Sequence, residues 1–213
     1  MGARENILDR IRAALGKNER KTAREAMRAY IARHAPGPRP QAEWNLIARF
    51  RERALSLASS VDEIAAFEQL PAASARYLRE HNLPLQAVCW PEFAQLDWTA
   101  HGMNVTARPA NGNDLVGITG AFCAIAETGT LVMLSGKGSP SATSLLPETH
   151  IAVVDTARIV KGMEEAWALL RSELSTMPRA VNFISGPSRT ADIEQTVSLG
   201  AHGPYRVHII LVN

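Results

Sequence analysis

A short polar segment, Glu127-Thr128-Gly129-Thr130, interrupts an otherwise apolar stretch of this 213-residue chain. A carboxylate among apolar neighbours loses water, which raises its pKa and suits it to acid–base or nucleophilic chemistry. Gly129 would permit a tight turn or the close approach of a ligand. The alternative is a glutamate at the end of a strand that points into water, because a buried unpaired carboxylate is costly. The sequence leaves both interpretations open.

A second candidate segment, GPSRT, lies between an expected strand and an expected helix, where open α/β sheets bind ligands. Its candidate ligand-binding residues are Gly186, Ser188, Arg189 and Thr190. The Arg189 guanidinium and free amides at a helix N-terminus could hold a carboxylate or phosphate. Asp192 and Glu194 oppose this, because they would themselves occupy the helix dipole and repel an anion. A simple helix cap with nothing bound is the alternative.

A third candidate is His202, which stands between small residues and is followed by Gly203. An exposed imidazole suits proton transfer or ligand contact; a turn whose histidine only hydrogen-bonds backbone is the alternative. The six histidines show no HxH or HExxH spacing, so we expect no metal site. The chain has two cysteines, Cys89 and Cys123, and no CxxC. This pattern excludes an iron–sulfur or Cys-ligated zinc site built from this chain alone.

The elements that must position these residues fall into two regions. Four amphipathic helices are expected early in the chain, at residues 4–15, 20–34, 42–58 and 72–81. Ser60 and Glu63 have the spacing of a capping box and predict a further short helix between the last two. We therefore expect an N-terminal helical region over residues 1–80.

Strand and helix patterns alternate in the second half of the chain. Strands are expected at residues 86–90, within 117–135, and at 151–155, 180–185 and 206–212; helices are expected at 163–174 and 191–199. This alternation predicts an α/β domain over residues 81–213, with a mostly parallel sheet flanked by helices.

Charge is distributed unevenly along the chain. Residues 1–53 contain 13 Lys/Arg and six Asp/Glu, whereas residues 54–213 contain 10 and 15. A basic arm on an acidic body can seek an acidic partner, a nucleic acid or the body itself, and a solvated helix face is the plainer alternative. The longest apolar stretch is broken by glycines, threonines and a glutamate, so no membrane span is expected. With no signal peptide pattern, we expect a soluble, cytoplasmic protein.

Four segments resemble signature stretches of one family, the LutC/YkgG group of LUD-domain proteins. They read AIAETGTLV, SLLPETHIAVV, FISGPSRTADIE and LGAHGP, and they occur in the family's order within residues 114–213. The resemblance implies a fold like the NagB/RpiA/CoA-transferase group. It also implies a role in L-lactate utilization, in which three proteins convert lactate to pyruvate and the two partner subunits carry the iron–sulfur clusters.

Three functional hypotheses follow. The first is a non-redox subunit of a lactate-oxidizing complex, whose motifs bind a small carboxylate or face a partner. The second is a stand-alone CoA-transferase- or isomerase-like enzyme that acts on an anionic substrate. In CoA-transferase relatives a glutamate on a comparable loop is the nucleophile, and the fold resemblance implies, by analogy, that Glu127 is its counterpart. The third is a binding or regulatory module. Its nucleic-acid version lacks a helix-turn-helix or an aromatic-interleaved basic patch.

Overall fold

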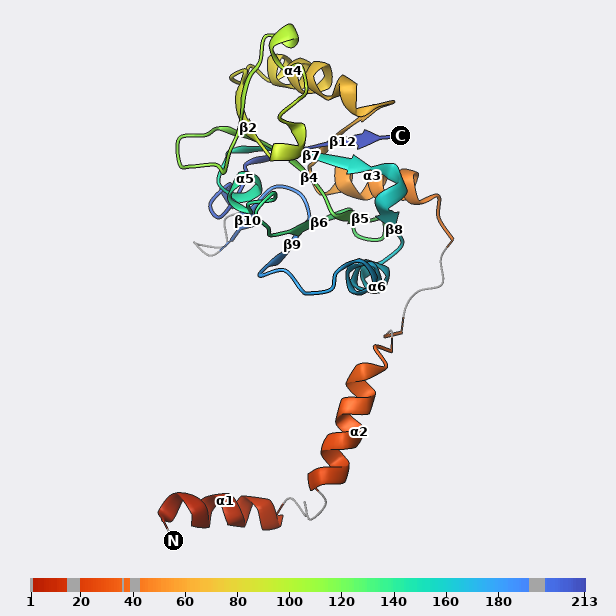
Figure 1. The fold of residues 1–213 in the computed structure, drawn as a ribbon, viewed down its shortest axis with the longest axis vertical. Helices are drawn as coiled ribbons and strands as arrows, with labels where there is room; N and C mark the ends of the chain where they lie inside the picture. The colour runs from red at the N-terminus through yellow and green to blue at the C-terminus, as the bar shows by residue number, and fades with distance from the viewer. Residues whose placement is uncertain (1, 15–19, 36, 39–42, 192–197) are drawn as a thin grey trace. The chain divides into compact units, whose positions relative to one another are not determined.

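A computed structural model describes residues 2–14, 20–35, 37–38, 43–191 and 198–213. The chain divides into two compact units, Met1–Ala42 and Glu43–Asn213 (Figure 1). The first unit contains helices α1 (Ala3–Ala14) and α2 (Arg20–Ala32), as the sequence predicted. No residue of α1 is buried, and Met27, Tyr30 and Ile31 of α2 are exposed as well. Both helices therefore present apolar side chains to solvent.

The second unit is built on a six-stranded sheet in which every strand pair is parallel. Its order is β1 (Ser60–Ile64), β12 (Arg206–Val212), β7 (Thr149–Asp155), β4 (Val116–Gly120), β2 (Gln86–Cys89) and β3 (Asn104–Ala107). The central strands are apolar and almost wholly buried, which is typical of parallel sheets covered on both faces. The predicted α/β class with a mostly parallel sheet is confirmed.

The short helix predicted at Ser60 is wrong, because residues 60–64 form edge strand β1. Ser60 pairs with His208 and Ile64 with Val212 in a parallel ladder that joins segments about 150 residues apart in the chain. An edge strand is covered on fewer sides than a central one, so it tolerates the polar residues Asp62 and Glu63, which imitate a capping box in the sequence. Pairing with β12 is the tertiary contact that decides the conformation.

A smaller sheet packs beside the first. It has the order β8 (Ile159–Val160), β5 (Cys123–Ile125), β6 (Thr130–Leu134) and β9 (Val181–Ile184), with β6 antiparallel to both neighbours. The helices of the unit are α3 (Leu46–Ser56), α4 (Leu70–Glu80), α5 (Ala142–Leu145) and α6 (Met163–Glu173). Short 3₁₀ turns cover Phe67–Gln69, Pro91–Phe93, Thr99–His101 and Thr156–Arg158.

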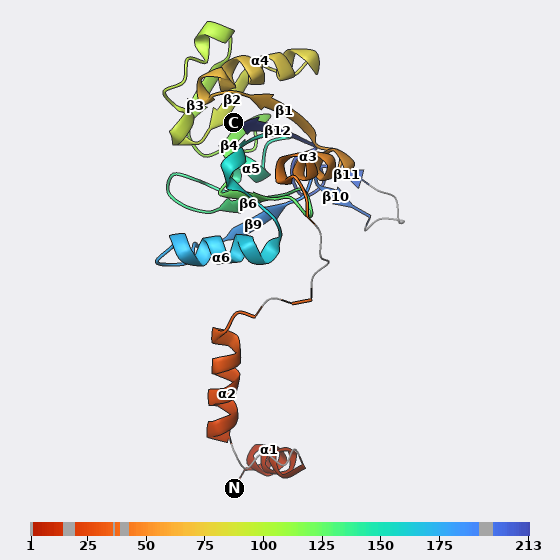
Figure 2. The ribbon, with the colours of Figure 1, turned by 90° about the vertical axis from the view of Figure 1, so that its right-hand side faces the viewer.

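These elements form layers that Figure 2 shows from the side. Helix α4 covers the outer face of the six-stranded sheet, and α6 covers the outer face of the smaller sheet. Helices α3 and α5 lie between the two sheets; α3 contacts β1 and β8, and α5 contacts β4 and β7. Helix α3, strand β1 and helix α4 all pack within this second unit, Glu43–Asn213.

The helix predicted at residues 191–199 is not found where the structure describes that segment. Strand β10 (Arg189–Thr190) pairs antiparallel with β11 (Ser198–Leu199), so the end of the predicted helix is extended. Asp192 and Glu194 lie outside the described residues. Ser188 and Thr190 therefore flank or form a two-stranded ribbon, and the helix cap expected there has no counterpart in the described backbone.

Candidate functional site

The Glu127–Thr130 segment forms the turn between β5 and β6. Gly129 has a φ of +67°, and a Cβ at this position would lie 2.7 Å from the backbone nitrogen of Ala54. The turn therefore packs directly on the C-terminal half of α3, and a glycine is required for this close approach. Glu127 is half-buried, and its backbone N–H donates to the carbonyl of Lys161 at 3.0 Å.

Hydroxyl groups join this turn to the end of β9. Thr128 Oγ1 and Thr130 Oγ1 lie 2.7 Å apart, and Thr130 Oγ1 lies 2.7 Å from Ser185 Oγ. Thr130, at the centre of this chain of hydroxyls, is buried, whereas Thr128 is half-buried and Ser185 is exposed. Each hydroxyl can donate or accept, which allows the chain to reorient its hydrogens.

The GPSRT segment follows Ser185 and packs on the same helix end. Gly186 has a φ of +78°, and a Cβ here would collide with the carbonyl oxygen of Leu57. That carbonyl also accepts a hydrogen bond from the Arg189 guanidinium at 3.0 Å. Arg189 therefore holds Leu57, the residue that follows α3. One N–H donor of the Arg189 guanidinium is thus already used within the protein.

Ser188 connects GPSRT to the LGAHGP segment. Its N–H donates to the Pro204 carbonyl at 2.9 Å, its carbonyl accepts from the Gly200 N–H at 2.9 Å, and its hydroxyl accepts from the His202 N–H at 3.4 Å. Gly203 lies beside the Ser188 side chain, and His202 is exposed. Gly129, Gly186 and Arg189 therefore meet at the end of α3, and Ser188 links this cluster to His202 and Gly203. Thr190 lies on the ribbon strand β10.

A pocket that the sequence analysis missed lies on another part of the six-stranded sheet. It has a volume of about 270 Å³ and is formed at the carboxyl ends of β2, β4 and β7 by Trp90, Glu92, Gly120, Phe122 and Asp155, among others. From β2 the chain passes to β3 at the edge of the sheet, and it then crosses back to β4, on the other side of β2. The pocket thus occupies the switch point of the strand order, the place where open α/β sheets bind ligands.

Glu92 and Gly120 lie against each other in the lining of this switch-point pocket. A Cβ at Gly120 would collide with the Glu92 carboxylate, so only glycine admits the carboxylate there. Desolvation raises the pKa of Glu92 above its ordinary value, although a hydrogen bond from the Gly120 N–H lowers it in part. One signal was present in the sequence: Glu92 follows the strand predicted at residues 86–90, and Asp155 ends the strand predicted at residues 151–155.

A second pocket, of about 250 Å³, lies beside β2, β3 and β4 and includes Arg108 and Asp114. The Arg108 guanidinium donates to both Asp114 oxygens, at 2.7 and 2.6 Å, and the Asn111 N–H donates to one of them at 2.7 Å. The hydrogen bonds from Arg108 hold the pKa of Asp114 below its ordinary value. Because these charges neutralise each other, they are not available to a ligand.

The two cysteines are buried on different strands, Cys89 on β2 and Cys123 on β5. Burial raises the pKa of each thiol to about 11. Since the thiolate is the metal ligand, these thiols are poorly suited to hold iron. Within the described ranges no group of three His, Cys, Asp or Glu residues is arranged to hold a metal ion, and no helix has the length and apolar character needed to cross a bilayer.

The parallel sheet with a pocket at its switch point defines an open α/β protein. The sequence profile of the LUD domain matches residues 55–212, so the chain belongs to the LUD-domain family. The solved DUF162 family protein from Deinococcus radiodurans has a similar fold, with a TM-score of 0.58 at 25% identity over 82% of this chain and 100% of that chain. The predicted family is confirmed.

Two curated relatives share a name. Lactate utilization protein C of Bacillus subtilis (strain 168) is 42% identical over 101 residues, which cover 46% of this chain and 42% of the relative. Lactate utilization protein C of Bacillus velezensis is 32% identical over 160 residues, which cover 71% of this chain and 66% of the relative. The chain thus matches less than two thirds of the length of either relative.

Proposed function

We propose that this chain is the non-redox subunit of a cytoplasmic L-lactate utilization system, in which it acts with iron–sulfur partner proteins to convert lactate to pyruvate. The observation that carries the proposal is the similarity of its LUD domain to relatives named lactate utilization protein C. The motif residues around the end of α3 are then the surface that binds a small carboxylate or faces a partner.

The cysteines support the assignment of redox chemistry to partners. A Cys₄ iron–sulfur cluster needs four thiolates, and this chain has two cysteines, both buried with the pKa of the thiol raised to about 11. If cysteine-ligated clusters accept the electrons from lactate, those clusters must therefore be held by other chains. In this proposal the chain contributes binding and assembly.

The N-terminal unit supports the presence of a partner protein. Residues 1–42 contain ten Lys/Arg and four Asp/Glu, and the described apolar side chains of α1 and α2 are exposed. Basic amphipathic helices are suited to an acidic partner surface that also offers apolar contacts. We propose that α1 and α2 dock the iron–sulfur partners.

The test combines genetics with purification from cells grown on L-lactate. Deletion of this chain should stop growth on L-lactate and leave growth on glucose unchanged, and the tagged chain should recover iron-containing partners. Arg24→Glu with Arg28→Glu in α2 should lower the iron recovered per chain, whereas Arg179→Glu, an exposed arginine of the second unit, should not.

Two results would overturn the proposal. Unchanged L-lactate growth in the deletion strain would remove the role in lactate utilization. Turnover of an acyl-CoA or sugar phosphate by the purified, iron-free chain, abolished by Glu127→Gln while the fold survives, would replace the proposal with the stand-alone enzyme.

A further inference from the structure

The switch-point pocket is lined by two carboxylates and by no basic residue. Its two ionisable lining residues are Glu92 and Asp155, and no Lys, Arg or His lines it. Neither carboxylate belongs to an ion pair within the part of the chain that the structure describes. Arg158, outside the lining, interacts with Asp155 only over a longer distance and is paired with Glu173. The second pocket differs in charge, because there Arg108 neutralises Asp114. A pocket of this charge attracts cations and repels small carboxylates such as lactate.

The hydrogen-bond donors around the switch-point pocket are largely engaged within the protein. The Trp90 indole N–H donates to the Pro140 carbonyl at 3.3 Å. The backbone N–H groups of Ala121 and Phe122 donate to the carbonyls of Val153 and Val132. The pocket therefore offers carboxylate acceptors in excess of donors, so its complementary ligand is one that brings donors.

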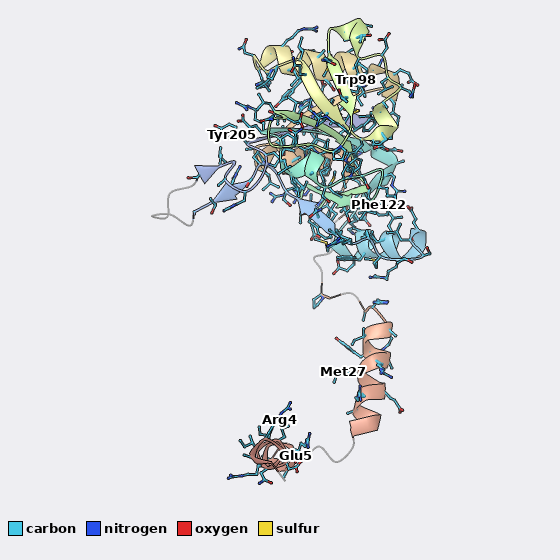
Figure 3. All side chains as sticks on the ribbon, turned by 60° about the vertical axis from the view of Figure 1, so that its left-hand side comes forward. Arg4, Glu5, Met27, Trp98, Phe122 and Tyr205 are labelled. Carbon is cyan, nitrogen blue, oxygen red and sulfur yellow. The ribbon has the colours of Figure 1, made fainter. Side chains whose placement is uncertain are left out.

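Four aromatic residues also line the pocket: Phe67, Trp90, Phe93 and Phe122. Phe122 already stacks against a cation, since the Arg158 guanidinium carbon lies 4.6 Å from its ring centroid. Each nitrogen of Arg158 makes a hydrogen bond within the protein: both terminal nitrogens lie 2.9 Å from Glu173, and Nε lies 2.6 Å from the Phe122 carbonyl. Figure 3 shows Phe122 on the flank of the unit where α6 lies. Aromatic faces next to carboxylates are suited to organic cations.

We propose that the switch-point pocket binds an organic cation, an alkylammonium or guanidinium group, with Glu92 and Asp155 as its anionic partners and Trp90 and Phe122 as its aromatic walls. The volume of about 270 Å³ suits a single side chain or a small amine better than a nucleotide cofactor. The cation comes either from a free small molecule or from a lysine or arginine of a partner protein. This site is separate from the motif residues at the end of α3, and it does not depend on the role in lactate utilization.

The test is a calorimetric or NMR titration of the full chain with n-butylguanidinium, its neutral isostere n-butylurea, and L-lactate. We expect saturable binding of n-butylguanidinium and at least about tenfold weaker binding of the other two, because hydrogen bonds to charged groups contribute the difference. Glu92→Gln and Asp155→Asn should each weaken n-butylguanidinium by about tenfold or more. The asparagine side chain keeps an oxygen acceptor for the Ala157 N–H, which Asp155 binds at 2.8 Å, so the local turn is retained.

The matched control is Glu80→Gln, which removes an exposed carboxylate of α4 outside the pocket and should leave the affinity unchanged. An arginine tripeptide amide with blocked ends then distinguishes the two sources. Binding at least as tight as that of n-butylguanidinium indicates a partner's side chain, whereas weaker binding indicates a free small molecule. Absence of n-butylguanidinium binding, equal binding of n-butylurea, or unchanged affinity in both pocket variants would overturn the proposal.

Discussion

Thr119 Oγ1 lies 2.7 Å from His150 Nε2, and these two fully buried side chains join the neighbouring strands β4 and β7. Burial lowers the pKa of His150 to about 4, so the imidazole is neutral near pH 7. Burial also lowers the pKa of His208, on β12, to about 4. Its Nδ1 lies 2.8 Å from Ser60 Oγ, and its ring stacks on that of Tyr77 with the ring centroids 3.8 Å apart. Two neutral histidines thus belong to the core of the six-stranded sheet.

These histidines predict that the protein loses stability in mild acid. The unfolded chain protonates each imidazole near its ordinary pKa of 6.5, whereas the folded chain resists protonation until about pH 4. Between these values the unfolded state binds more protons, so the free energy of unfolding falls as the pH falls, by about 1.4 kcal/mol per histidine per pH unit. Urea unfolding at pH 7.5, 6.0, 5.0 and 4.5 measures the slope.

A variant isolates one histidine's share of that slope. His208→Phe retains a ring that can stack on Tyr77 and should remove about half of the dependence between pH 6.5 and 4. His202→Gln, which replaces the exposed histidine near Ser188, serves as the control and should leave the slope unchanged. An unfolding free energy that is equal at pH 7.5 and 5.0 in the wild-type chain would contradict the prediction.

Thr119→Val should destabilise the fold although it preserves shape. The substitution removes the hydroxyl that pairs with His150 Nε2, and Nδ1 of the same ring already lacks a partner among the described residues. A buried imidazole with neither nitrogen paired costs about 1–3 kcal/mol, which chemical denaturation can measure at pH 7.5. Thr119→Ser keeps the hydroxyl and should cost less than the valine variant. The reverse order would show that packing of the methyl group outweighs the hydrogen bond.

The sequence predicts those elements that local pattern determines. Apolar runs identified the buried strands at Thr149–Asp155 and Arg206–Val212, and helical periodicity identified α3, α4 and α6. Strand β1 was missed because its conformation depends on a partner about 150 residues away. The ribbon of β10 and β11 was missed for a related reason, since two-residue strands carry no measurable alternation.

The two candidate sites also differ in how far the sequence alone could reveal them. The motifs around Gly129, Gly186 and Ser188 were found from residue types, and the structure brings them together at the end of α3. The switch-point pocket was not found, because its position depends on the strand order β7-β4-β2-β3. Glu92 and Asp155 follow different strands, and no spacing in the sequence reveals that these strands end side by side.

Thr130→Val should break the hydroxyl chain at its centre. Thr130 Oγ1 contacts both Thr128 and Ser185 at 2.7 Å, so its loss leaves two hydroxyls without this partner. Thr130 is buried, and we expect a loss of about 1–3 kcal/mol in the free energy of unfolding. If the turn also serves lactate utilization, complementation of a deletion strain on L-lactate should weaken more than this loss explains. Thr130→Ser keeps the chain and should complement as the wild type does.

Gly129→Ala should be among the most damaging single-methyl additions in the second unit. The left-handed φ of +67° disfavours any side chain, and the new Cβ would lie 2.7 Å from the Ala54 nitrogen and 2.8 Å from the Arg53 backbone carbon. These backbone atoms belong to α3 and cannot rotate away, so the turn or the helix must shift, at a cost of about 1–3 kcal/mol or more.

Gly138→Ala is the control, because no atom lies within 4 Å of its added Cβ and its φ is not in the left-handed region. It should change the midpoint of thermal unfolding little or raise it slightly, as reduced freedom of the unfolded chain predicts. Equal midpoints for the two variants would show that α3 yields to the turn, and that the ETGT segment is not held against the helix as tightly as the distances indicate.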